Sequence, residues 1–430
     1  MESEIEHLDS KLFDKKKFMK QLDIIKNASE AAQAKIDYFS AHDDNIIRSI
    51  EIVEQFLRKK HRLCYGGQAI NAHLPQKYKI YDPDMTIPDY DFFTPDQNND
   101  INTIIKDLKI AGFTEISVRE GMHEGTVKIY VDFIPVADLT SIDPQLYKIL
   151  SKREFKTDGI SYLDANTLRM LMYLELSRPR GEVGRWTKVF ERLSLFNEFI
   201  PIKSCRISKS LHTLFTTEQL EFTIHFIILN KRLFAGANLL EFYNKTLITK
   251  KLTNKWILNN KKPVIFFSPE AENDASIIKN EFKALHGKSY TIKSYSSKGM
   301  DSIPSMKIIY QDKTPIVFIV EQVACHSYFN IPMKGKNIKI ASMDTLITLY
   351  FSLGLVDSKF FDIGAMECLA NKIVDISLKS RMNPHKFPLP FISIKCTGYQ
   401  KTLPSLIREK VHRITQKRQK MKELVSKKHH

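Results

Sequence analysis

Glycine and proline are scarce in this sequence, and long apolar runs are missing. Only 15 of the 430 residues are Gly and 17 are Pro, which excludes a low-complexity or collagen-like chain. No apolar run approaches the roughly 18 residues of a membrane-spanning helix. The N-terminus, with Glu2, Glu4 and Lys11, has no apolar core of the kind that a signal peptide needs. We therefore expect a globular protein of two or three domains with no membrane association.

The cysteines are too few and too scattered to form a framework. An odd number, with no CxxC pair and no Cys/His cluster, argues against structural zinc and against a disulfide scaffold. The expectation is reduced thiols in an intracellular protein. The five positions are Cys64, Cys205, Cys325, Cys368 and Cys396.

Acidic residues are also in short supply. Lys and Arg number 65 against 49 acids, a formal net charge of +16, which favours a polyanionic partner. Residues 400–430 contain ten basic and two acidic residues, so 10 − 2 = +8, half of the total, lies in this tail. The tail could follow an RNA backbone; a docked helix with a solvated basic face and a disordered extension are the alternatives.

The first half of the chain alternates short strands and helices. Apolar residues at helical spacing lead to residue 59, and Leu63 to Tyr65 is a short strand that ends at Gly66-Gly67. A strand with alternating polarity follows at 89–93, then a helix capped by Asn99-Asp100. Strand-like runs at 115–118 and 126–137 come before a helix at 164–176. This pattern predicts a small mixed α/β (α+β) sheet and not a Rossmann unit, since no G-x-G-x-x-G occurs.

Two carboxylates, Asp89 and Asp91, lie on one face of the strand at 89–93, roughly 7 Å apart. A D-x-D pattern alone is more often a solvated strand face. Here its neighbours Tyr90 and Phe92 indicate a buried strand, where unpaired carboxylates would be costly. A pair of Mg²⁺ ions would satisfy them, and a third acid from a neighbouring strand would complete the site. Asp132 and Asp138 are both candidates.

Gly66-Gly67 lies about twenty residues upstream, between a strand and a helix. Glycines at such a position let backbone N–H groups approach a triphosphate, and the helix start adds a favourable dipole. The pair alone is only a turn signal. Followed by D-x-D and a later strand Asp, it becomes fairly specific for a nucleotide site.

This order of motifs resembles the DNA polymerase β-like nucleotidyltransferase superfamily. Five segments further resemble the poly(A) polymerase catalytic subunits of large cytoplasmic DNA viruses, those of mimivirus-like giant viruses above all and the poxvirus enzyme more distantly. The segments are Tyr65 to Asn71, Asp89 to Pro95, His123 to Thr126, Val136 to Thr140 and Leu176 to Pro179, followed by Arg185 to Val189. The motif-bearing stretch is about 60–192.

The resemblance implies a role for each matching residue. Gly66 and Gly67, with Gln68 and Asn71 in the same motif, would hold the nucleoside triphosphate. Asp89 and Asp91 would bind metal, and the family pattern puts Asp138 ahead of Asp132 as the third ligand. Apart from the resemblance, three basic residues around a Pro-Arg-Gly turn could clamp phosphates, with a solvated basic loop as the alternative: Arg178, Arg185 and Lys188.

The second half of the chain contains a weak repeat of the first. Residues 265–269 with 273–279 resemble 91–95 with 99–106, which places Asp89 on Pro263 and Asp91 on Ile265. Residues 314–326 resemble 126–138, so Asp138 would fall on His326 or Cys325, and Asp344 would match Asp164. The expected domains are a helical segment 1–45, a catalytic domain 46–192, a helical linker 193–255, a degenerate nucleotidyltransferase-like domain 256–395 and a basic tail 396–430.

The resemblance implies a template-independent poly(A) polymerase that adds AMP from ATP to RNA 3′ ends by two-metal phosphoryl transfer, as in mRNA polyadenylation. Mg²⁺ or Mn²⁺ would be the cofactor, and RNA and ATP the partners, with a homodimer favoured over a separate processivity subunit. It also implies a cytoplasmic location in the viral factory, with packaging in the virion as an option and no secretion. The alternatives are a nucleotidyltransferase of other base specificity and an inert RNA-binding subunit on the same fold.

Overall fold

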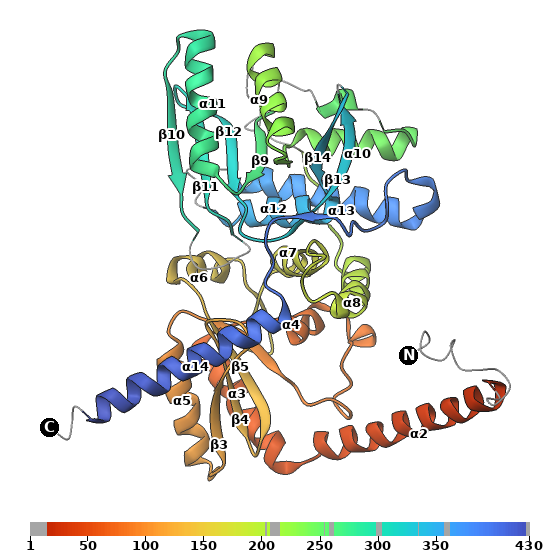
Figure 1. The fold of residues 1–430 in the computed structure, drawn as a ribbon. Helices are drawn as coiled ribbons and strands as arrows, with labels where there is room; N and C mark the ends of the chain where they lie inside the picture. The colour runs from red at the N-terminus through yellow and green to blue at the C-terminus, as the bar shows by residue number, and fades with distance from the viewer. Residues whose placement is uncertain are drawn as a thin grey trace.

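The computed structural model describes residues 15–202, 204–206, 216–252, 254–257, 262–297, 303–333, 335–356 and 362–426. Two mixed β-sheets, each with helices packed against it, form the upper and lower halves of Figure 1. The predicted mixed α/β fold class is confirmed. No helix in the described part of the chain is long and apolar enough to cross a membrane.

The first sheet has seven strands in the order β3-β4-β5-β2-β1-β7-β6. The pairs β2–β5 and β1–β7 are parallel and the other neighbours are antiparallel. The strand bounds are β1 Leu63–Tyr65, β2 Tyr90–Thr94, β3 Ile116–Glu120, β4 Thr126–Val131, β5 Ile134–Ser141, β6 Phe155–Thr157 and β7 Ile160–Tyr162.

Six helices accompany this sheet. An Asp N-cap begins three of them, because Asp43, Asp143 and Asp164 accept hydrogen bonds from the first-turn N–H groups of α3, α6 and α7. The bounds are α3 Asp44–Lys60, α4 Gly66–His73, α5 Gln97–Ile110, α6 Pro144–Ser151, α7 Ala165–Leu176 and α8 Trp186–Phe199, with 3₁₀ turns at Gln76–Tyr78 and Val183–Arg185.

The second sheet has eight strands in the order β10-β11-β12-β9-β8-β14-β13-β15. Its strands are β8 Leu233–Phe234, β9 Val264–Ser268, β10 Tyr290–Tyr295, β11 Met306–Gln311, β12 Thr314–Glu321, β13 His326–Met333, β14 Lys336–Ala341 and β15 Cys396–Thr397. The associated helices are α9 Thr217–Leu229, α10 Asn238–Thr249, α11 Ala271–His286, α12 Met343–Leu353 and α13 Ile363–Met382, with 3₁₀ turns at Asn254–Ile257 and Pro384–Lys386.

The two sheets repeat one topology. Numbered by position along the chain, β8 to β14 follow the same spatial order as β1 to β7, and each neighbouring pair keeps its parallel or antiparallel sense. We call β1–β7 with α4–α8 the first copy and β8–β14 with α10–α13 the second copy. The helices α7 and α12 pack against each other between the copies.

A buried ion pair is repeated with the same geometry. In the first copy, Arg62 Nε donates to Asp100 Oδ2 at 2.7 Å, and Thr94 Oγ1 donates to the same carboxylate at 2.5 Å. In the second copy, Arg232 Nε donates to Asp274 at 2.7 Å and Ser268 Oγ at 2.6 Å. Asp100 therefore binds Arg62 and is no helix cap: it lies inside α5, whose N-cap is Asp96. The predicted Asn99-Asp100 cap is wrong.

The strand registers correct parts of the predicted repeat. Asp91 pairs with Asp138 as Ile265 pairs with Phe318, so Phe318 stands in the place of Asp138. The predicted match to His326 or Cys325 is wrong because the run 126–137 is two strands, with a turn at Asp132-Phe133. The N-cap Asp164 corresponds to the N-cap Ser342, two residues before Asp344.

Two terminal helices extend from the copies. Helix α2, Lys15–Ala41, projects from the first copy; residues 1–14 of the expected N-terminal segment 1–45 lie outside the described residues. The basic tail forms α14, Leu403–Ser426, which crosses the first copy (Figure 1). Arg413 donates to the carbonyl of Met122, and Lys417 pairs with Glu120. The tail is thus a docked helix, while Lys427 and Lys428 lie beyond the described part.

Four of the five cysteines form disulfides, Cys205–Cys368 and Cys325–Cys396, and Cys64 is a buried free thiol. The expectation of reduced thiols is wrong for this structure. The pairs are 163 and 71 residues apart in sequence. Sequence spacing could not reveal them, because each bond joins segments that are far apart in sequence and meet only in the folded chain.

Replacing Cys325 and Cys396 together by Ser should lower the free energy of unfolding by about 4 kcal/mol, because a bond that closes a long loop restricts the unfolded chain. Thermal melting with and without a reductant measures this effect. Cys64→Ser is the control, and its melting temperature should keep its response to reductant. Identical wild-type melting curves with and without reductant would contradict the prediction.

Candidate active site

Three carboxylates gather where β2 and β5 run side by side. Asp91 in β2 and Asp138 in β5 are direct partners in the parallel register. Asp89 comes just before β2, and its spacing of two residues from Asp91 places the two side chains on the same face. Asp138 is only 5% exposed, and its Oδ1 is buried without a hydrogen-bond partner among the described atoms. The fold therefore brings three carboxylates together on one part of the β2–β5 strand pair.

Burial and mutual repulsion disfavour the ionised form of these acids. Burial, followed by the charges of Asp89 and Asp138, raises the pKa of Asp91 to about 7. Desolvation and then the charge of Asp138 raise the pKa of Asp89, even though Asp89 is an exposed residue. Burial also raises the pKa of Asp138, against the opposing effect of Lys128. The site therefore favours a bound cation.

Lys128 supplies one positive charge to this cluster. It lies directly opposite Asp138 in the antiparallel β4–β5 pair, and its Nζ binds Asp138 Oδ2. One local pattern indicates its orientation: Lys128 is polar between the apolar residues Val127 and Ile129, which predicts that it faces the polar side of the strand. The register needed to place it beside Asp138 comes only from the structure.

Gly66 lies against Asp91. Its φ is +71°, and a Cβ at this position would be 2.4 Å from Asp91 Oδ2, far inside van der Waals contact. Only glycine avoids both the left-handed backbone strain and this collision. The glycine thus lets the start of α4 and the Asp91 carboxylate approach each other closely.

Gly67 faces two residues that sequence reasoning missed, Tyr81 and Arg192. A Cβ on Gly67 would be 2.0 Å from the Tyr81 hydroxyl and 3.2 Å from Arg192 Nη1. Arg192 Nη2 donates to the Tyr81 hydroxyl at 2.7 Å, and its guanidinium lies over the Tyr81 ring. A guanidinium beside a glycine loop is suited to bind phosphate oxygens. Arg192 carries no local motif, and only the packing of α8 against α4 reveals it.

The other residues of the glycine motif have different environments. Asn71 accepts hydrogen bonds from the N–H groups of Ile80 and Tyr81, at 2.8 and 3.4 Å, so its Oδ1 holds the loop that carries Tyr81. Gln68 is half-buried in the first turn of α4. Tyr65, just before the loop, donates to or accepts from Thr140 at 2.8 Å and stacks on Phe93.

Asp132 is separated from the cluster. It occupies the β4–β5 turn with φ +47°, and its side chain is exposed. Asp138, the favoured third ligand, is the acid that the structure places beside Asp91. The metal-binding role of Asp138 stays a prediction.

Of the three basic residues that were expected to clamp phosphates, one lies near the carboxylates. The charge of Arg185 opposes the rise in the pKa of Asp91, and its guanidinium lies 3.5 Å from Glu175. Arg178 acts instead on His326 of the second copy, whose pKa burial and then Arg178 lower to about 3. Lys188 is exposed in the first turn of α8 and forms no ion pair within the residues described.

The side chains at this site have the type of oxygen ligand that divalent cations bind. Asp89, Asp91 and Asp138 offer hard oxygen ligands, which Mg²⁺ and Mn²⁺ prefer. Across the described ranges, no three His, Cys, Asp or Glu side chains are already drawn together as a metal cluster. Lys128 occupies the outer oxygen of Asp138, so a metal ion would have to displace or share that contact.

Residues 51–182 match the family model of the poly(A) polymerase catalytic subunit. Two provisionally named poly(A) polymerase catalytic subunits are similar in sequence. That of African swine fever virus (strain Badajoz 1971) is 27% identical over 158 residues, 36% of this chain and 33% of that protein. That of Acanthamoeba polyphaga mimivirus is 30% identical over 159 residues, 36% of this chain and 26% of that protein. The match thus spans about a third or less of these relatives.

A solved structure, the Megavirus polyadenylate synthase, shares the fold. It superimposes with a TM-score of 0.74 at 17% identity, over 96% of this chain and 85% of that one. The resemblance to viral poly(A) polymerase catalytic subunits is therefore confirmed for residues 51–182, and the fold extends over nearly the whole chain.

Proposed function

We propose that this chain, which carries the viral poly(A) polymerase catalytic subunit segment at 51–182, adds AMP from ATP to RNA 3′ ends without a template. The observation that supports this most is the register of Asp91 with Asp138 beside Gly66. Acids on adjacent strands at a glycine-led helix start suit phosphoryl transfer, which depends on positioning and charge neutralisation and needs no protein nucleophile.

Each residue of the site has an assigned task in this proposal. Asp89, Asp91 and Asp138 hold Mg²⁺ or Mn²⁺. When bound, two such ions lower the pKa of the attacking RNA hydroxyl and neutralise the leaving pyrophosphate. The N–H groups at the Gly66-Gly67 start of α4 receive the triphosphate, and Arg192, which lies against Gly67, binds phosphate oxygens there. Lys128 keeps Asp138 in place between turnovers.

The RNA strand needs a basic path to this site. Helix α14 lies across the first copy with Arg418, Lys420 and Lys422 exposed to solvent. Their charges can attract RNA by releasing its counterions. The proposed active form is a homodimer, with a separate processivity subunit as the alternative.

A primer-extension assay tests the proposed function. The full chain, a short RNA primer, Mg²⁺ or Mn²⁺ and one NTP at a time should give long products with ATP and far shorter products with GTP, CTP and UTP. Light scattering on the same preparation should give twice the 49.9 kDa chain mass. Extension with UTP or CTP instead would indicate another base specificity. RNA binding without any extension would indicate an inert RNA-binding subunit.

A further inference from the structure

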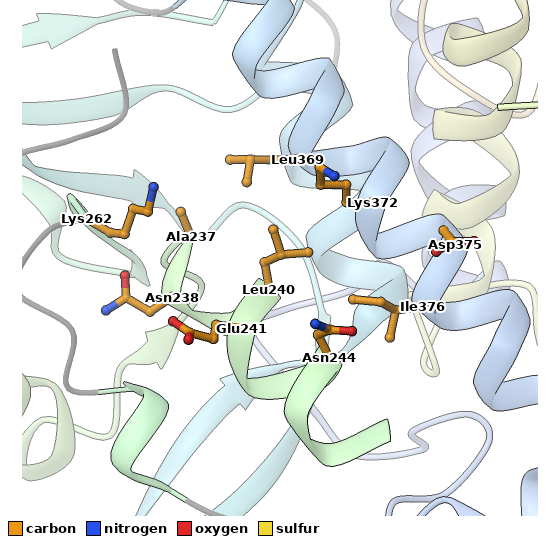
Figure 2. A pocket seen from close by; sticks show the side chains of 10 residues that line it. All are labelled: Ala237, Asn238, Leu240, Glu241, Asn244, Lys262, Leu369, Lys372, Asp375 and Ile376. Carbon is orange, nitrogen blue, oxygen red and sulfur yellow. The ribbon is translucent and has the colours of Figure 1, made fainter. Parts of the chain in front are cut away.

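A cavity of about 350 Å³ opens in the second copy between the start of α10 and the middle of α13 (Figure 2). This volume is at the lower end of the range for small-ligand pockets. The side chains that line it combine lysines, amides, acids and an apolar floor: Ala237, Asn238, Leu240, Glu241, Asn244, Lys262, Leu369, Lys372, Asp375 and Ile376.

The cavity corresponds to the nucleotide end of the first copy. Leu63 pairs with Phe93 as Leu233 pairs with Phe267, so Gly236-Ala237 takes the place of Gly66-Gly67. Helix α10 then corresponds to α4, and α13 packs on it as α8 packs on α4. A Cβ on Gly236 would be 2.8 Å from the Phe234 ring and would meet no carboxylate. At this position the second copy has a hollow and lacks counterparts of Asp89, Asp91 and Asp138.

The walls of the cavity suit a nucleotide. Lys262 and Lys372 are half-buried on different sides of the cavity, with Leu240 between them (Figure 2). Lys372 forms no ion pair within the described part of the chain, so its charge is available to a phosphate. Lys262 is attracted to Glu241, and burial lowers the pKa of Lys262. The apolar floor can cover a base, and the Asn244 amide can read an adenine edge.

A second hollow lies further along α10 and α13, and we call the two hollows together the groove between α10 and α13. It has a volume of about 250 Å³ and is lined by Leu247, Lys250, Lys379, Asn383, Lys386 and Phe387. Lys379 Nζ forms an ion pair with Oδ2 of Asp375, which lines the first hollow, at 2.6 Å. The two hollows together contain five lysines against Glu241 and Asp375. Successive basic hollows fit the repeated phosphates of a strand better than those of one mononucleotide.

We propose that the groove between α10 and α13 is a second, metal-independent nucleotide site that holds adenylate units of single-stranded RNA. The identity of the RNA rests on the proposed function of the first copy. A free adenine nucleotide presents the same base and phosphate, so the experiment must separate these two sources. Bound there, the growing tail would stay attached to the chain while its 3′ end is extended in the first copy.

Fluorescence anisotropy of labelled oligo(A) with the full chain in EDTA tests this site, because without divalent metal no catalysis contributes. Lys372→Glu with Lys386→Glu should weaken binding on the order of tenfold and lower the salt slope by about 1.4. The matched control is Lys288→Glu with Lys313→Glu, two exposed lysines of the same copy, which should change binding less than about twofold. Equal weakening by both pairs would overturn the proposal.

Two further arms keep the result interpretable. Lys372→Gln with Lys386→Gln tests charge removal in case the Glu pair unfolds, and wild-type affinity in the folded Gln pair would also overturn the proposal. Displacement of labelled oligo(A) by oligo(A) but not by AMP supports RNA as the occupant, and displacement by AMP as well supports both sources. Equal displacement by oligo(U) contradicts an adenylate site. None of these readouts needs primer extension, so failure of this site and failure of the proposed function are separate outcomes.

Discussion

Asp138→Asn should lower metal-dependent primer extension on the order of a thousandfold, whereas Asp132→Asn should leave it within about threefold. Asp138 is buried and paired in register with Asp91, while Asp132 is exposed in the β4–β5 turn. Asn keeps the size of Asp but removes the charge that a divalent cation needs. Initial rates with ATP and an RNA primer, at saturating Mg²⁺, measure the difference.

The paired substitution provides its own control, because the two acids lie six residues apart on one hairpin and receive the same change. Asp138→Asn should not destabilise the fold, because it removes a negative charge that raises the pKa of both Asp89 and Asp91. A melting temperature within a few degrees of wild type would show this. Strong loss in Asp132→Asn with activity retained in Asp138→Asn would reverse the assignment of the third ligand.

Gly66→Ala should abolish extension as fully as loss of Asp91 itself. A methyl group would be 2.4 Å from Asp91 Oδ2, and the φ of +71° would add about 1–2 kcal/mol of left-handed strain. Either the carboxylate or the start of α4 must move, and both belong to the proposed site. Extension rates and RNA binding by the same variant measure the effect, since binding through α14 and the second copy should persist.

Gly112→Ala is the matched control for this substitution. Gly112 also has a positive φ, +94°, but a Cβ there meets no atom within 4 Å. It should therefore show the backbone strain as a lower melting temperature and keep full activity. Equal loss of activity in both variants would show that strain alone, and not the contact with Asp91, explains the first result.

Local patterns in the sequence were sufficient for part of this site. Gly66-Gly67 and Asp89-x-Asp91 are close in sequence, and period-2 alternation places both acids on one face. Asp138 was preferred over Asp132 only through the family resemblance, because both lie in one strand-like run and the turn at 132–133 carries no Gly or Pro to mark it.

Residues that depend on register or helix packing could not be predicted. Lys128 reaches Asp138 across a hairpin, and Arg192 reaches Gly67 from a helix more than a hundred residues away in sequence. The first block of the repeat was aligned correctly. The later blocks were misaligned because no change of pattern in the strand-forming run marks the boundary between β4 and β5. The disulfides were missed because a contact between residues far apart in sequence leaves no local signal.

The second copy shows what this architecture looks like when the carboxylates of the first copy are replaced. It retains the buried Arg232–Asp274 pair with the geometry of Arg62–Asp100, and it retains the whole strand order. Yet Pro263, Ile265 and Phe318 stand where the first copy has its three acids, and Ile308 stands opposite Phe318 as Lys128 stands opposite Asp138. This architecture therefore forms with apolar residues at these positions, and it does not depend on the charged residues that the first copy has there.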